Sequence, residues 1–178
     1  MTGKIEVKLE SCLHETQYML RNGGLLLASL GSSGRPNVMT IGWGLIGVMW
    51  RRPVFMVAVR KSRHTHSLME ETGEFTVNVP HNGMENLTSF CGTNSGRDHD
   101  KFKEAKLTAI PGRKVKTPAI EECAIHYECR TIGKLEVSAG SVSGEVFSEI
   151  YSSDSFHTLY FGEILTTYAD QDAREKPQ

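Results

Sequence analysis

Short apolar runs bounded by Gly, Pro, Asn or Ser recur along the chain, a pattern typical of β-strands. The runs predict strands at residues 25–30, 38–48, 54–60, 75–79, 124–130, 144–150 and 159–166. The segment GSSG after Leu30 has the composition of a tight turn, so the first two strands are expected to form a hairpin. Helical patterns are short, at 65–71 and 84–90, and end at Gly73 and near Gly92. The sequence therefore predicts a mainly β fold with short helices, either a barrel or a sandwich.

The length and net charge of the chain limit the number of domains and the classes of partner that are expected. The chain has 178 residues, 39% of them hydrophobic, with no linker or repeat, so we expect a single domain over 1–178. Residues 1–20 are expected to be a peripheral N-terminal segment and 170–178 a polar tail. The formal net charge of −1 argues against nucleic acid or an anionic membrane surface as a partner. No apolar run approaches the roughly 20 residues that span a bilayer, and no secretory signal is visible, so a cytoplasmic location is expected.

The segment CAIHYEC contains two of the four cysteines and a histidine, the residue types of a metal site. Its alternation is that of a strand, which places His126 on the face opposite Cys123 and Cys129. No C-x-x-C or H-E-x-x-H spacing is present. We therefore expect structural thiols, Cys12 and Cys91 included, and no metal.

The string GWGLIG fits the G-x-G-x-x-G pattern of dinucleotide-binding domains. That pattern requires a helix after the glycines, whereas VMWRRP follows here and Pro53 disfavours helical geometry. We interpret the stretch as a strand whose glycines leave its backbone open to a flat ligand.

The segment RKSRHTHSLMEE follows a predicted strand and begins a helix, where cations, hydroxyls and a helix N-terminus together suit a phosphate monoester. A solvated basic turn is the alternative. The candidate phosphate ligands are Arg60, Lys61, Ser62, Arg63 and Thr65. A second loop, SGRDHDKF, adds Ser95, Gly96, Arg97 and Lys101, although alone it has the composition of a polar surface loop.

Together these segments resemble the flavin reductase-like family, and within it the flavoredoxin type. The resemblance rests on NVMTIGW, RKSRHT, GEFTVNV and CGTNSGRDHDKF in this order, and less strongly on FHTLYFGEI, and it runs from about residue 25 to 168. It implies an FMN-binding split β-barrel.

The resemblance also implies roles for particular residues. One stretch would pass along the isoalloxazine ring: Asn37, Met39, Thr40, Ile41, Gly42 and Trp43. The basic turn would hold the FMN phosphate, the SGRDHDKF loop would close over the ribityl and phosphate end, and Asn78 would lie under the ring. His157 would orient the hydride donor or assist proton transfer, although Ser155 and Phe156 stand where the family commonly has glycine and aspartate.

Other aromatic residues have simpler interpretations. Trp50 is expected in the core or at an interface, whereas for Trp43 a core and a flavin-stacking role both stay open. The loop and helix-start histidines are expected to be surface residues: His64, His66, His81 and His99.

The function implied by the resemblance is an NAD(P)H-dependent flavin reductase that passes electrons through bound FMN. The alternative is a flavoredoxin-like carrier that a partner protein reduces, without direct NAD(P)H activity, and a ligand-binding barrel without flavin is a third. The resemblance also implies a homodimer with FMN near the subunit interface.

Overall fold

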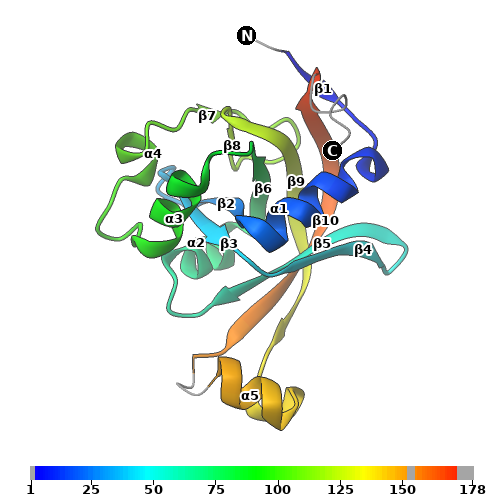
Figure 1. Ribbon diagram of the computed structural model, residues 1–178, viewed down its shortest axis with the longest axis vertical. Helices are drawn as coiled ribbons and strands as arrows, with labels where there is room; N and C mark the ends of the chain where they lie inside the picture. The colour runs from blue at the N-terminus through cyan, green and yellow to red at the C-terminus, as the bar shows by residue number, and fades with distance from the viewer. Residues whose placement is uncertain (1–2, 152–154, 172–178) are drawn as a thin grey trace.

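The computed structural model describes residues 3–151 and 155–171 (Figure 1). Its strands are β1 Lys4–Glu6, β2 Leu25–Leu30, β3 Pro36–Ile41, β4 Gly44–Met49, β5 Arg52–Arg60, β6 Glu74–Pro80, β7 Ala109–Ile110, β8 Ala119–Ile120, β9 Cys123–Glu136 and β10 His157–Asp170. Its helices are α1 Leu13–Asn22, α2 His64–Thr72, α3 Glu85–Thr93, α4 Lys101–Glu104 and α5 Gly144–Ile150, with 3-10 turns at Leu9–Cys12 and Ala139–Ser141.

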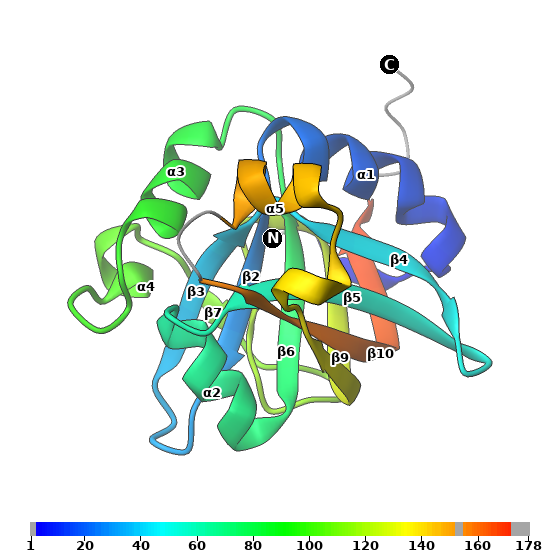
Figure 2. The ribbon, with the colours of Figure 1, turned by 90° about the horizontal axis from the view of Figure 1, so that it is seen from below.

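Eight strands form one curved antiparallel sheet in the order β3-β2-β6-β9-β10-β5-β4, with β1 beside β10. β3 and β4 lie at the two ends of this order, and β7 and β8 make a separate pair. Figure 2 shows α2 and α3 flanking the β2–β3 side of the sheet. Figure 1 shows β9 and β10 running beyond the body of the molecule to α5. The prediction of a mainly β fold with short helices is confirmed.

Alternation along β2 separates two apolar clusters. Leu25 and Leu27 enter the main core with large rings such as Phe55 and Tyr127. Leu26 faces the other way and joins a second cluster with residues of α3 and α4. Successive side chains of a strand point to opposite faces. One face of β2 therefore packs in the main core, and the other packs against α3 and α4, the helices on either side of the loop that contains Ser95 and Arg97.

Two strand predictions were wrong. Residues 38–48 form two strands, because the chain leaves β2 after Ile41, bends at Gly42 and Trp43, and then pairs with β5 at the other end of the sheet. Residues 144–150 form α5 and not a strand, and the Ser143 hydroxyl caps this helix by accepting a hydrogen bond from the Val146 amide at 3.3 Å.

The other predicted elements are present, and the structure differs from the prediction mainly in their lengths. The predicted hairpin of β2 and β3 is confirmed, and the strands at 124–130 and 159–166 are longer than expected. Part of the segment 1–20 packs closely on the sheet, where the Thr16 hydroxyl lies 2.6 Å from that of Tyr127. Asp170 ends β10 in an ion pair with Lys4, and the tail predicted for 170–178 otherwise lies almost wholly outside the described residues.

The CAIHYEC segment forms part of β9, and its cysteines are buried. No group of side chains suited to a metal occurs within residues 3–151 and 155–171. Over the same residues, no helix has both the length and the apolar character needed to cross a membrane.

Candidate functional site

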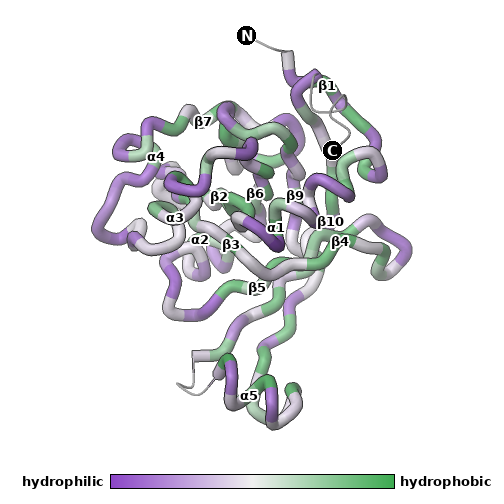
Figure 3. Tube along the Cα trace, in the orientation of Figure 1, coloured by the Kyte–Doolittle hydropathy of each residue, from purple (hydrophilic) through white to green (hydrophobic). Residues whose placement is uncertain are grey.

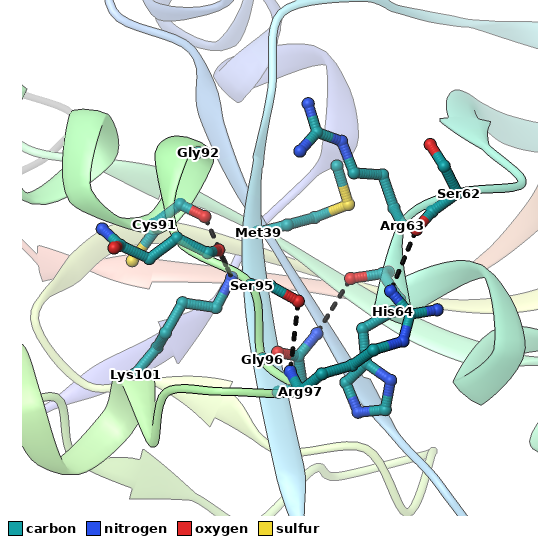
Figure 4. Close-up of a pocket in the computed structure, with 13 residues that line it drawn as sticks. Met39, Ser62, Arg63, His64, Cys91, Gly92, Ser95, Gly96, Arg97 and Lys101 are labelled. Atoms are coloured by element: carbon teal, nitrogen blue, oxygen red, sulfur yellow. Dashed lines mark hydrogen bonds between the residues drawn. The ribbon is translucent and has the colours of Figure 1, made fainter. Parts of the chain in front are cut away.

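Two adjacent cavities open beside β3. The first, which we name the basic pocket, has a volume of about 270 Å³, and the second, the Trp43 pocket, about 180 Å³. Met39 and Arg63 line both, so the cavities are neighbours along one strand. The basic pocket is lined by Asn37, Met39, Ser62, Arg63, His64, Thr65, Cys91, Gly92, Asn94, Ser95, Gly96, Arg97 and Lys101 (Figure 4). The Trp43 pocket is lined by Met39, Thr40, Ile41, Gly42, Trp43, Ala58, Arg60, Arg63 and His157.

One wall of the basic pocket is the turn from β5 into α2. Arg63 has extended backbone geometry at the start of the helix, and Thr65 follows in the first turn with its side chain buried. The Asn37 side-chain amide donates a hydrogen bond to the Thr65 hydroxyl at 2.8 Å and so fixes this hydroxyl in the pocket. The first turn of a helix also presents backbone N–H groups and a partial positive charge, both of which favour an anion.

The opposite wall is the loop between α3 and α4. The Arg97 guanidinium donates to the Ser62 carbonyl at 3.0 Å, so the loop reaches across to the β5–α2 turn (Figure 4). Gly96 packs so closely that a Cβ there would overlap the Asn37 side-chain oxygen and lie 2.9 Å from its Cγ. Glycine at this position therefore permits the loop to close on β3.

Lys101 is a buried basic residue in the lining of the basic pocket. Only 4% of the residue is exposed, and its ammonium donates to the carbonyls of Cys91 at 3.0 Å and Asn94 at 3.1 Å. Burial lowers the pKa of Lys101, and the Arg63 charge lowers it further. None of the ion pairs between described residues includes Arg63 or Lys101. Because an unneutralised buried cation is costly, the buried Lys101 ammonium, with the exposed Arg63 nearby, favours an anion in this pocket.

The Trp43 pocket lies where β3 ends, after Ile41. The Trp43 ring lies with its centroid 4.7 Å from that of His157, and the His157 Nδ1 lies 3.0 Å from the Tyr151 hydroxyl. Burial, with smaller contributions from the charges of Arg60 and Arg63, lowers the pKa of His157 to about 4. His157 is therefore neutral near pH 7 and acts there as a hydrogen-bonding group rather than a cation.

Two of the predicted phosphate ligands, Arg60 and Lys61, lie outside the basic pocket, and Asn78 lies outside both pockets. Arg60 lines the Trp43 pocket, and its guanidinium donates to the carbonyls of Ser155 and, at 3.3 Å, of Ile150, the last residue of α5. Lys61 is exposed and forms an ion pair with Glu136 at 2.8 Å. Asn78 is fully buried, away from both pockets.

The Asn78 side chain is committed to the fold. Its oxygen accepts from the Ile120 amide at 3.1 Å and lies 2.9 Å from the His126 Nδ1, while its amide donates to the Leu26 carbonyl at 3.2 Å. The side chain thus joins β6 to three neighbouring segments and has no free group for a ligand.

The sequence interpretation missed other lining residues, mainly His64, Cys91, Gly92 and Asn94. His64 was expected at the surface, and its position between Arg63 and Thr65 was the available signal. Trp50 is not a core residue, since it is 58% exposed and packs edge-on against Phe161.

Comparison with known proteins shows the family to which this chain belongs. The family model described as "Flavin reductase like domain" matches residues 20–177, and the chain therefore belongs to the flavin reductase-like family. A curated relative, an uncharacterized protein of Archaeoglobus fulgidus, is 35% identical over 144 residues, which cover 80% of this chain and 71% of that protein.

Two solved structures have the same fold. The flavoredoxin from Methanosarcina acetivorans is 30% identical with a TM-score of 0.69, over 88% of this chain and 74% of that one. The flavoredoxin of Desulfovibrio vulgaris (Miyazaki F) is 26% identical with a TM-score of 0.69, over 84% and 70%. The predicted family and its split-barrel fold are confirmed.

Proposed function

We propose that this chain binds FMN, with the phosphate in the basic pocket and the isoalloxazine ring in the Trp43 pocket, and works as an NAD(P)H-dependent flavin reductase. The observation that carries the proposal is a pair of cations, Arg63 and Lys101, that have no carboxylate partner among the described residues and lie beside the first turn of α2. A phosphate monoester carries about −1.5 to −2 charges near neutral pH and three acceptor oxygens, which suits this set of donors.

The ligands proposed for the phosphate are Arg63, Thr65, Ser95 and Arg97. Arg63 lines both pockets, so one guanidinium would face the phosphate end and the ring end of the same ligand. Lys101 is also buried, and its two carbonyl partners leave one N–H of the ammonium for the anion.

Backbone and neutral side chains would hold the ring. Thr40, Ile41 and Gly42 line the Trp43 pocket where the strand ends, so their peptide groups are candidates to bond the polar edge of the ring. Bound FMN would supply hydride acceptance and electron transfer in single or paired steps. His157, neutral near pH 7, would orient the nicotinamide or the ring through its hydrogen bonds, while Arg60 would hold the adjoining α5 segment in place.

An apolar surface next to the site supports the further proposal of a homodimer with FMN near the interface. The β4–β5 hairpin exposes Leu45, Val48, Met49 and Trp50 by 68%, 81%, 41% and 58%, and Leu135 on β9 is 55% exposed. Figure 3 shows the apolar run of β4 beside a hydrophilic turn. Because β4 is a sheet edge and such apolar patches are uncommon on monomers, a second copy is the partner we propose.

The second candidate is an electron carrier that a partner protein reduces, which the similarity to two flavoredoxins favours. Anaerobic titration of the FMN-loaded protein with NADH and then NADPH separates the two. A reductase loses the absorbance of oxidised flavin with the nucleotide alone, whereas a carrier keeps it until a reducing protein is added. Failure of the purified protein to bind FMN would refute both.

A further inference from the structure

A third cavity lies behind the basic pocket, between the β2–β3 turn, α2 and the loop before α4. Its volume is about 440 Å³, and we name it the outer pocket. Residues that it does not share with the basic pocket include Ser32, Arg35, Glu71 and His99. The close contact of Gly96 with the Asn37 side chain forms part of the wall between the two cavities.

The outer pocket is positively charged. Arg35, Arg97 and Lys101 line it, and Glu71 is the one carboxylate among the described lining residues. Glu71 is already engaged, because its carboxylate accepts from the Ser32 amide at 2.8 Å and the Ser32 hydroxyl at 2.7 Å. Arg35 has an exposed partner outside the lining, Asp100, at 3.6 Å.

The pKa of His64 is lowered by burial and by the same positive charges. Burial lowers the pKa of His64, and the charges of Arg97, Lys101 and Arg35 lower it further, in that order. The neighbouring buried ammonium of Lys101 has no carboxylate partner among the described residues. An anion in the outer pocket would therefore gain from several cations at once.

Flat side chains accompany these charges. The His99 ring is held by a contact of 2.9 Å between its Nδ1 and the Glu104 carboxylate, and by an edge-on packing against Phe90. The Arg35 guanidinium is planar, and 60% of its side chain is exposed. Imidazole rings and guanidinium planes are surfaces on which nucleic-acid bases stack.

We propose that the outer pocket binds a nucleoside phosphate, either a free nucleotide or one half of a dinucleotide, at a site separate from that of the FMN phosphate. The phosphate would lie toward Arg35, and the base against His99, since both residues line the outer pocket and not the basic pocket. This proposal goes beyond the flavin site and does not depend on it.

The test is calorimetric titration of the FMN-saturated protein with AMP, in parallel with inorganic phosphate. Binding of AMP that excess FMN does not displace supports the site. Arg35→Ala and His99→Ala should each weaken AMP binding by roughly tenfold, the effect of one charge-assisted or stacking contact, and leave the FMN Kd unchanged. Arg130→Ala is the matched control, since Arg130 is also an exposed arginine with one carboxylate partner, at 3.5 Å, and lies outside the pocket.

Several results would overturn the proposal: no AMP binding, equal affinity for inorganic phosphate, displacement of AMP by FMN, or equal AMP affinity in the Arg35 and Arg130 variants. A chain that binds AMP but not FMN would refute the flavin proposal and leave this one standing. Competition with FAD then shows whether the ligand is a free nucleotide or one half of a dinucleotide. Displacement of AMP by FAD supports a dinucleotide half, and retention of AMP supports a free nucleotide.

Discussion

Gly96 offers a sharp test of how the basic pocket closes, because replacing it with alanine adds a single methyl group. The new Cβ would overlap the Asn37 oxygen and lie 3.1 Å from the His64 Cδ2, and Asn37 is held in place by its hydrogen bond to Thr65. The loop must then withdraw from β3 and carry Ser95 and Arg97 away from the phosphate. Loss of one charge-assisted hydrogen bond costs about 1.5–3 kcal/mol, so the FMN Kd should rise roughly 10- to 100-fold.

The assay is quenching of FMN fluorescence on titration with flavin-free protein, with thermal unfolding measured alongside. Gly140→Ala is the control, because a Cβ at Gly140 would meet nothing within 4 Å. An FMN Kd for Gly96→Ala equal to that of the control would refute the idea that this loop closes on the phosphate.

Three further predictions concern the charge, the histidine and the surface patch. Lys101→Met should raise the FMN Kd by roughly tenfold in the same titration, since one donor to the anion is lost, and an unchanged Kd would remove Lys101 from the site. The pKa of His157 is about 4 in the folded chain, below its ordinary 6.5, so the folded state binds fewer protons and loses stability as pH falls through this window. Denaturant unfolding at pH 7 and 4.5 should therefore show a smaller loss for His157→Asn than for the wild type, and an equal loss would contradict the assignment. The double variant Leu45→Glu and Val48→Glu should sediment as a monomer where the wild type sediments as a dimer, and a dimeric variant would place the interface elsewhere.

Local patterns were sufficient to predict the fold class, most strands and the β5–α2 wall of the basic pocket. The β5–α2 turn could be identified from sequence because cations, hydroxyls and a helix start lie within a few residues of one another. The Ser95–Arg97 loop needed the resemblance, since only tertiary packing against β3 distinguishes it from a surface loop.

The errors have physical causes. Asn78 lies in the expected strand, but the partners of a buried side chain depend on neighbouring strands that are distant in sequence. Residues 144–150 were predicted as a short strand, but they form a helix whose N-terminus is capped by the Ser143 hydroxyl. Arg60 was grouped with Arg63 by proximity in sequence, yet Arg60 still belongs to β5 and donates to carbonyls near α5.

The most direct test of the central claim is FMN binding by a pair of matched variants in the β5–α2 turn. Arg63 lines both pockets and has no ion-pair partner within residues 3–151 and 155–171, whereas Lys61, two residues away, is exposed and paired with Glu136. The account predicts that flavin-free protein binds about one FMN per chain, that Arg63→Ala weakens binding roughly 10- to 100-fold, and that Lys61→Ala leaves it unchanged. Equal affinities in the two variants, or no FMN binding by the wild type, would contradict it.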